Sequence, residues 1–544
     1  MDGLIMDRPL LISSLLEFGA RNHAGSEIVS RSVEGPIHRY TLADSHARSK
    51  QLAKALTKLG VKSGDRIATI AWNGYRHFEL YFGVSGMGAV CHTINPRLFH
   101  EQIVYVINHA EDKYVFMDLT FVPLLEALAA HLPKVAGYVI MTDRAHMPET
   151  KLENALCYED LLAAEDDDYT WPEFDERTAS SLCYTSGTTG NPKGVLYSHR
   201  STVLHTFAVC ASGGAGPTSY STYLALVPMF HVNAWGLPYA CAMTGAKLVL
   251  PGPRYEGDMI FDLMDEEKVD QSAGVPTLWL LLLGEMKKRG RKPQAFEKLV
   301  VGGSAFPASM IETFEDTYGI EVHHAWGMTE LSPIGTMGSL LPAMNSLPKE
   351  QRWAEKCKQG RAIYGVEKKI VDENSERLPE DGKAFGELLV RGPWTASAYF
   401  NDKEATAQSF TEDGWFRTGD VCTLDPNGIM HIVDRSKDVI KSAGEWISSI
   451  DLENAAMAHP AIQEAAVIGM PHPKWDERPL LVVVAAEGQT PALEEVNEFL
   501  TDKVAKWWLP DDMVTLDELP HTATGKVSKL NLREQLKDYV FPEV

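Results

Sequence analysis

A run of glycine, hydroxyl and lysine residues at positions 184–195 has the composition of a phosphate-binding loop. The segment reads Tyr184-Thr-Ser-Gly-Thr-Thr-Gly-Asn-Pro-Lys-Gly-Val195. Glycines let backbone N–H groups approach phosphate oxygens, while the hydroxyls and the ammonium add further donors. A Walker A loop is excluded because, counting from Gly187, that pattern needs glycine where Pro192 stands. The composition alone is also compatible with a flexible surface loop.

Two acidic residues further along the chain suit other parts of a nucleotide complex. Glu330 offers the hard oxygen ligands that Mg²⁺ prefers, although a Thr-Glu pair on its own is more often a helix cap. Asp420, in a Thr-Gly-Asp triplet, can accept hydrogen bonds from both ribose hydroxyls or can simply be a turn residue. The sequence therefore offers a phosphate loop, a metal ligand and a ribose acceptor.

The net charge and the cysteine spacing argue against several functional classes of protein. The 544 residues include 51 Lys and Arg against 74 Asp and Glu, a net charge of −23. This field repels phosphate and argues against a nucleic-acid binder or an anionic-membrane binder, so a polyanionic ligand needs a local site. The seven cysteines are scattered and never form a CxxC pair, which argues against a disulfide scaffold or structural zinc and favours a reducing cytoplasm.

No segment is typical of secretion or of membrane insertion. The N-terminal stretch carries Asp2, Asp7, Arg8 and Glu17 and has no uninterrupted apolar region. The longest apolar stretch, 273–284, falls short of the roughly 18 residues that span a bilayer. The sequence predicts a cytoplasmic protein without a membrane span.

The chemistry-bearing residues require an α/β framework to position them. A helix is predicted after Thr41, ending at Gly60, and strands are predicted at 66–73, 114–118 and 137–142 with a helix at 121–132 between the last two. Strands that alternate with helices indicate parallel-rich sheets covered on both faces. We expect a large, multi-lobed body over residues 1–433.

The pattern changes near residue 434. A Gly- and charge-rich stretch, 434–444, precedes a predicted helix that Pro460 terminates, two strands (465–470 and 480–486) and a helix at 493–508. These form a compact α+β unit of about 110 residues, which is within the usual size of a domain. We predict a hinge at 434–437 and a small, mobile lid domain at 438–544.

The loop and a series of further motifs resemble the adenylate-forming superfamily, which includes acyl-CoA synthetases, luciferases and peptide-synthetase adenylation domains. The resemblance spans nearly the whole chain, with the motifs in family order. After the loop they are PMFHVNAW around His231, VVGGSAFP around Gly302, Trp326-Gly-Met-Thr-Glu330, Thr418-Gly-Asp420, Asp434-Arg-Ser-Lys-Asp438, Ser442-Ala-Gly-Glu-Trp446 and Pro520-His-Thr-Ala-Thr-Gly-Lys526.

The resemblance implies roles in binding ATP or AMP. Trp326, where many members have tyrosine, would cover one adenine face and the backbone of 303–305 the other, with His324 and Ala325 at the adenine edge. Arg435, otherwise a surface salt-bridge residue, would join Asp420 at the ribose or phosphate, and Thr185 would share Mg²⁺ with Glu330. The full set of nucleotide-binding residues expected is Thr185, Ser186, Gly187, Thr188, Thr189, Gly190, Lys193, Gly303, Ser304, His324, Ala325, Trp326, Thr329, Asp420 and Arg435.

The acyl group is expected beside His231, Trp235 and Gly302. His231 resembles the gating residue of aliphatic-acid ligases, between the ATP phosphates and the acyl pocket, and is taken as catalytic. Trp235 stands four residues later, so on an α-helix it would share the face of His231 and line the pocket. Plain core packing is the alternative role for this tryptophan.

The C-terminal motifs imply a reaction in two steps. Lys526 matches the lysine that bridges the substrate carboxylate and the α-phosphate while acyl-AMP and pyrophosphate form. In the family the lid then rotates about a hinge, here Lys437, and CoA displaces AMP. Lys441, Gly444, Glu445 and Trp446 are expected along the CoA channel.

Within the superfamily, the segments 6–16, 71–98 and 229–252 resemble the bacterial fatty-acid:CoA ligases, especially those acting on 3-methylmercaptopropionate. The resemblance implies an ATP- and Mg²⁺-dependent acid:CoA ligase for a short or medium carboxylic acid, with a homodimeric assembly. Three alternatives stay open: a general medium-chain acyl-CoA synthetase, an adenylation enzyme that loads a carrier protein, and a nucleotide-binding regulator without catalysis.

Overall fold

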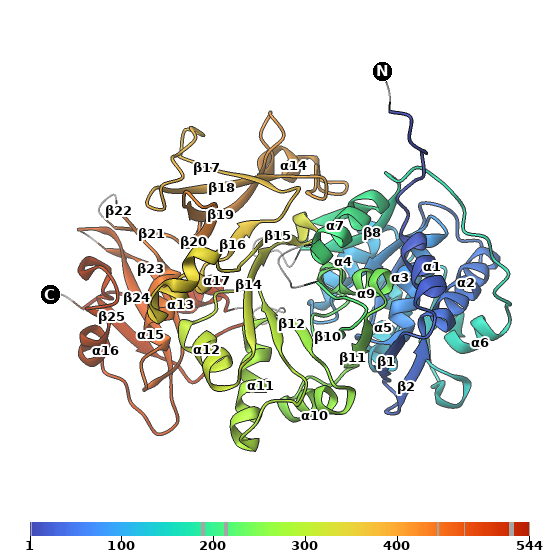
Figure 1. The fold of residues 1–544 in the computed structure, drawn as a ribbon, viewed down its shortest axis with the longest axis horizontal. Coiled ribbons are helices and arrows are strands. Elements are labelled where there is room, and N and C mark those ends of the chain that lie inside the picture. Colours follow the sequence, from blue (N-terminus) through green and yellow to red (C-terminus); the bar gives the residue numbers. More distant parts are fainter. Residues whose placement is uncertain are drawn as a thin grey trace.

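The computed structural model describes residues 1, 3–185, 191–211, 216–442, 445–472, 474–521 and 527–542, with the side chains of 445 and 446 outside the description. Figure 1 shows the N-terminal helices at one end of the molecule and the C-terminal sheet at the other. None of the helices that the structure describes is both long and apolar enough to cross a membrane.

Two large sheets form the body. In each of them, a strand that leads into a predicted nucleotide-binding motif has a parallel neighbour: β8 beside β4 in one sheet and β13 beside β14 in the other. In the smaller of the two, only the last pair is antiparallel. Its strands, in spatial order, are β7 (Ala155–Cys157), β6 (Gly137–Ile140), β5 (Tyr114–Met117), β3 (Arg66–Ile70), β4 (Val90–Thr93), β8 (Ala179–Tyr184) and β9 (Gly194–Ser198).

The larger sheet is antiparallel from β14 to β17, parallel from β14 to β1, and ends with the antiparallel β1–β2 pair. Its spatial order is β17 (Glu367–Val371), β18 (Phe385–Arg391), β19 (Phe416–Leu424), β20 (Ile429–Arg435), β16 (Gly360–Ala362), β15 (Ile334–Met337), β14 (Glu321–Gly327), β13 (Lys298–Val301), β12 (Gln271–Gly274), β10 (Thr222–Ala225), β11 (Lys247–Leu250), β1 (Glu27–Arg31) and β2 (Ile37–Thr41).

Helices cover these sheets, and one buried core joins side chains of α1, α3, α7 and α9 to strands of both. The helices of the body are α1 (Ile12–Asn22), α2 (Leu42–Lys58), α3 (Tyr75–Gly86), α4 (His100–Ala110), α5 (Val122–Leu128), α6 (Tyr158–Ala163), α7 (His199–Ala211), α8 (Val232–Trp235), α9 (Leu237–Thr244), α10 (Gly257–Glu267), α11 (Pro276–Arg289), α12 (Ala308–Glu312), α13 (Lys349–Cys357) and α14 (Lys403–Ser409).

Local signals explain where several of these elements lie. Helix α2 begins after Thr41, whose side chain accepts from the Asp44 N–H while the Asp44 carboxylate accepts from the Thr41 N–H, a capping box. The predicted helix at 42–59 is therefore confirmed. Strands β3, β5 and β6 and helix α5 also lie where the sequence predicts them.

A small third sheet carries the C-terminal residues (Figure 1). It consists of β22 (Glu445–Ile447), β21 (Ile440–Ser442), β24 (Asp476–Ala485), β23 (Ile462–His472) and β25 (Asp512–Thr515), with helices α15 (Ser449–Met457), α16 (Leu493–Leu500) and α17 (Lys529–Gln535). The predicted helix at 493–508 is wrong in its second half. Helix α16 stops at Leu500, and a separate 3₁₀ turn follows at Lys506–Trp508.

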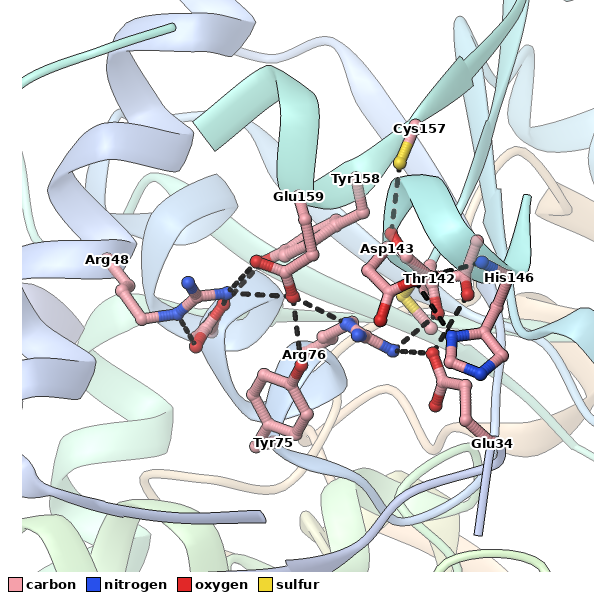
Figure 2. Close-up of polar contacts among 12 residues, drawn as sticks. Glu34, Arg48, Tyr75, Arg76, Thr142, Asp143, His146, Cys157, Tyr158 and Glu159 are labelled. Carbon is pink, nitrogen blue, oxygen red and sulfur yellow. Dashed lines mark hydrogen bonds and ion pairs between the residues drawn. The ribbon is translucent and has the colours of Figure 1, made fainter. Parts of the chain in front are cut away.

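A buried network of charges lies between α2, α3 and α6 (Figure 2). The Glu159 carboxylate forms ion pairs with Arg48 at 2.9 Å and with Arg76 at 2.7 Å. Arg76 also pairs with Glu34 at 2.7 Å. Arg48 also pairs with the fully buried Glu79 at 2.7 Å. Burial opposes ionisation of Glu159, but the two arginines outweigh it and hold its pKa below the ordinary range. These pairs connect the β1–β2 turn to the helices of the neighbouring sheet.

Candidate active site

The two ends of the predicted phosphate loop are held together by backbone hydrogen bonds. The Thr185 N–H donates to the Lys193 carbonyl at 2.9 Å, and the Lys193 N–H donates to Thr185 Oγ1 at 3.2 Å. Strand β8 leads into this closure and β9 leaves it, so the sheet fixes where the loop departs. The predicted loop residues Ser186, Gly187, Thr188, Thr189 and Gly190 lie outside the described residues.

Glu330 is a buried carboxylate beside this closure. It lies in the 3₁₀ turn Thr329–Leu331 and is 5% exposed. Its Oε1 accepts from the Tyr399 hydroxyl at 2.6 Å, and the Lys193 ammonium lies 4.9 Å from the centroid of the Tyr399 ring. Burial raises the pKa of Glu330 against the pull of Tyr399 and nearby cations, so a further cation beside the carboxylate would stabilise its ionised form.

This arrangement fits the predicted Mg²⁺ site. Mg²⁺ commonly takes one or two protein oxygens together with phosphate and water. The Glu330 carboxylate and the Thr185 hydroxyl are oxygen ligands of that kind. The Tyr197 hydroxyl donates to the Thr329 carbonyl at 2.6 Å, which ties β9 to the turn that carries Glu330.

The predicted ribose-binding residues are brought together with Trp326. The Trp326 Nε1–H donates to Asp420 Oδ2 at 2.8 Å, and Arg435 Nε pairs with Asp420 Oδ1 at 2.9 Å. The indole packs on Gly335, where a Cβ would lie 2.4 Å from its Cζ3. Asp420 is thus buried and oriented, while each of its oxygens keeps a second lone pair for another donor.

The predicted adenine edge lies next to the end of β13. His324 Nδ1 lies 2.7 Å from the Cys357 carbonyl and Nε2 lies 3.4 Å from the Ser304 carbonyl. Burial lowers the pKa of His324 to about 4, so the ring is neutral near pH 7. Gly303 has φ +90°, a left-handed conformation that favours glycine.

The Trp235 indole packs against Gly302. Both residues are predicted to line the acyl pocket, which requires them to lie close together. A Cβ at Gly302 would lie 3.0 Å from Trp235 Cη2 and 3.0 Å from the Ala325 carbonyl oxygen. The predicted helical relation between His231 and Trp235 is wrong, however. Residues 232–235 form a left-handed turn with φ between 46° and 56°, so α-helical spacing does not place the two side chains on one face.

Asn233 anchors this left-handed turn to the strand that precedes the phosphate loop. Its Nδ2 donates to Ser181 Oγ at 2.9 Å, and Cys183 Sγ lies 3.5 Å from its Oδ1. Each L-residue in a left-handed helical conformation costs about 1–2 kcal/mol, and asparagine tolerates that conformation better than most residues. The anchored side chain holds the His231–Trp235 segment against β8.

Two of these residues were missed by the sequence reasoning. Tyr399 stands 69 positions from Glu330, and no spacing or composition signal connects them. Asn233 belongs to the PMFHVNAW motif but was passed over. Its own type was the available hint, because asparagine adopts the left-handed conformation more readily than most residues.

The predicted hinge and CoA-channel residues are only partly described. Lys437 is exposed in the connection between β20 and β21. Lys441 Nζ lies 3.6 Å from Glu373 Oε1, a pair between the small sheet and the body. Glu445 and Trp446 lie in β22, and the predicted Gly444 and Lys526 lie outside the described residues.

Known proteins resemble this chain over nearly its whole length. The AMP-binding enzyme family matches residues 16–400, and its C-terminal domain family matches residues 451–526. A 3-methylmercaptopropionyl-CoA ligase of Ruegeria lacuscaerulensis is 52% identical over 99% of both chains. A medium-chain-fatty-acid–CoA ligase of Ectopseudomonas oleovorans is 50% identical over 99% of this chain and 98% of its own.

The fold is matched by solved structures as well. An anthranilate CoA ligase in complex with anthranoyl-AMP superposes with a TM-score of 0.86 over 98% of this chain and 99% of that one, at 23% identity. The chain therefore belongs to the AMP-binding enzyme family, as an AMP-forming acid:CoA ligase with the adenylate-forming fold and a small C-terminal domain.

Proposed function

We propose that this ligase activates a short or medium carboxylic acid, with 3-methylmercaptopropionate as its physiological substrate. The observation that carries the choice of substrate is the identity of 52% and 51% to two ligases of that name. The indole of Trp235 over Gly302 supports it, because an aromatic ring suits a thioether by sulfur–aromatic contact. A general medium-chain specificity is the second candidate, favoured by the relative at 50% identity.

The first step joins the acid to ATP. A carboxylate oxygen attacks the α-phosphorus, pyrophosphate leaves, and acyl-AMP forms. Thr185, Lys193 and the loop between them would bind the phosphates, and Asp420 with Arg435 would hold the ribose. Lys526 would stabilise the anionic oxygens that approach one another. A Mg²⁺ ion held by Thr185 and Glu330 would supply charge neutralisation on the phosphates.

The second step transfers the acyl group to CoA. The division into a body at 1–433, a hinge at 434–437 and a lid at 438–544 belongs to the proposal, with Lys437 as the pivot. Rotation would withdraw Lys526 and bring residues 444–446 to the CoA channel beside Lys441. A cytoplasmic location and a homodimer remain predictions, the second of which light scattering tests.

The decisive experiment measures products with a panel of acids from C2 to C12 that includes 3-methylmercaptopropionate and cinnamates. We expect acid-dependent pyrophosphate and an acyl-CoA product, with the highest kcat/KM for 3-methylmercaptopropionate. A maximum at octanoate would favour the medium-chain alternative. Acyl transfer to a carrier protein but not to CoA would contradict the proposal.

The role of Lys526 is tested by separating the two steps. Lys526→Ala should reduce acyl-AMP formation by about 10²–10³-fold, as expected for loss of an electrostatic donor. Thioester formation from supplied acyl-AMP should persist. Lys537→Ala is the matched control, because Lys537 lies on the surface and pairs only with Glu534 among the described residues. Equal loss of both steps in Lys526→Ala would refute the assignment.

A further inference from the structure

A histidine–carboxylate pair lies fully buried at the seven-stranded sheet that contains β4 and β8. His92, in β4, and Asp112, in the turn between α4 and β5, are both 0% exposed. His92 Nδ1 lies 2.7 Å from Asp112 Oδ2. The other ring nitrogen, Nε2, is buried and has no hydrogen-bond partner among the described residues.

This pairing fixes the role of each ring nitrogen. An ionised Asp112 carboxylate only accepts hydrogen bonds, which assigns a proton to Nδ1, and the neutral tautomer with that proton has a lone pair on Nε2. A buried polar atom without a partner is costly to retain, and in native proteins it calls for an explanation such as a catalytic role. His92 therefore presents an oriented and unused proton acceptor.

The location connects His92 with the reaction. His92 lines a cavity together with His231 and Tyr184. Strands β4 and β8 are parallel neighbours, and ligands of open α/β sheets bind beyond the carboxyl ends of such strands. The His92 ring lies 5.1 Å from the Tyr184 ring, one residue before Thr185 at the closure of the phosphate loop.

We propose that His92, oriented by Asp112, is the base that accepts the proton of the CoA thiol in the second step. This role rests on the proposed ligase mechanism. As the thiol sulfur bonds to the acyl carbon of acyl-AMP, the S–H proton passes to His92 Nε2. The bond between the acyl carbon and the phosphate oxygen breaks, AMP leaves with both electrons, and His92 then returns the proton to water.

The groups that face His92 are consistent with this role. Burial raises the pKa of Asp112, while His92 and Arg66 oppose that rise, and the contact with Asp112 fixes the orientation of the His92 ring. Burial raises the pKa of Cys183 to about 11 and that of Tyr184 further, so neither is an effective base near pH 7. The Tyr184 hydroxyl is also engaged by His109 at 2.7 Å. His231 is the other histidine on the described cavity wall.

The test separates the two half-reactions in His92→Gln and Asp112→Asn. In Asp112→Asn the amide would donate to Nδ1 and place the ring proton on Nε2, which removes the acceptor while keeping the shape. For both variants we expect thioester formation from supplied acyl-AMP and CoA to fall about 10²-fold at pH 7. Acid-dependent pyrophosphate formation should stay within about twofold of the wild type, because the thiol takes no part in it.

The pH profile distinguishes a base from a structural residue. The deficit should shrink toward pH 9, because a free thiol with a pKa of about 8.5 then ionises without help. The matched control is His77→Gln, since His77 is buried in the same part of the fold but has partners on both ring nitrogens, Thr69 Oγ1 at 2.9 Å and the Trp72 carbonyl at 3.1 Å. It should change both half-reactions in equal proportion.

Three results would overturn the proposal: thioester formation within threefold of the wild type in both variants, equal loss of the two half-reactions, or a deficit that does not change with pH. A wild-type enzyme that forms no acyl-AMP from any acid would instead overturn the proposed function. If His92→Gln does not fold, Asp112→Asn alone decides the matter.

Discussion

Replacing Trp235 with alanine should change which acids the ligase prefers. The indole covers Gly302 so closely that a methyl group there would lie 3.0 Å from its Cη2. Trp235 is also partly buried, so part of the ring is available to line a pocket. Removing it would lengthen the space for the acyl chain and remove the aromatic partner of a thioether.

The magnitudes follow from the contacts that are lost and gained. Loss of a sulfur–aromatic contact costs about 0.3–1.5 kcal/mol, which lowers kcat/KM for 3-methylmercaptopropionate roughly two- to tenfold. Each newly buried CH₂ contributes about 0.8 kcal/mol, so two methylenes of octanoate in the vacated space would raise its kcat/KM about 15-fold. The preference for the shorter acid should therefore fall by about one to two orders of magnitude.

The assay is pyrophosphate release with butyrate, 3-methylmercaptopropionate, hexanoate and octanoate, together with thermal unfolding. Gly302→Ala is the complementary change, because the Ala325 carbonyl is fixed in the backbone and only the indole can yield to the new methyl group. It should shift preference toward shorter acids, and the double variant should lose this shift. A destabilised Trp235→Ala enzyme that slows equally with every acid would refute the pocket argument and assign Trp235 to core packing.

Two further predictions concern residues that support the site, and a third concerns the charge network around Glu159. Tyr399→Phe removes the hydroxyl that donates to Glu330 at 2.6 Å, so pyrophosphate formation should fall about tenfold and its dependence on the Mg²⁺ concentration should change; unchanged Mg²⁺ dependence would contradict the metal assignment. Asn233→Ala removes the anchor of the left-handed turn and should raise KM for the acid severalfold more than KM for ATP in steady-state kinetics, whereas equal effects would contradict a positioning role. Glu159→Gln should lower the free energy of unfolding by about 2 kcal/mol at pH 7, with activity per folded molecule retained. Because the folded-state pKa of Glu159 is depressed, its stabilisation is present above the unfolded value near 4.5 and is lost as pH falls through the folded value. Denaturant titrations between pH 3 and 7 should therefore show a smaller acid-induced loss of stability in the variant, and identical profiles would contradict this assignment.

The regular framework was predictable because its signals are local. The capping pair Thr41–Asp44 and the spacing of apolar residues define α2, and short apolar runs define β3, β5 and β6. The phosphate loop, Glu330 and Asp420 could be predicted as site residues because each stands in a short motif of consecutive residues. The structure places Asp420 in contact with both Trp326 and Arg435, and the roles of the three residues in binding the nucleotide stay predictions.

The remaining features depend on tertiary contacts that leave no local signal. The turn at 232–235 is left-handed although its sequence is compatible with an α-helix, because Asn233 is held by β8. Tyr399 meets Glu330 only when the chain between β18 and α14 folds back over the turn. The buried pair His92–Asp112 joins a strand to a turn 20 residues away, and neither residue stood out in the sequence.

The central claim is that the carboxylate attacks the α-phosphorus of ATP and forms acyl-AMP, and isotope transfer tests it most directly. The enzyme would be incubated with ATP, CoA and 3-methylmercaptopropionate labelled with ¹⁸O in both carboxylate oxygens, and the products would be analysed by mass spectrometry. The mechanism predicts one ¹⁸O atom in each AMP and none in pyrophosphate, because the C–O bond to the phosphate breaks in the second step. Label in inorganic phosphate, with ADP in place of AMP, would contradict it.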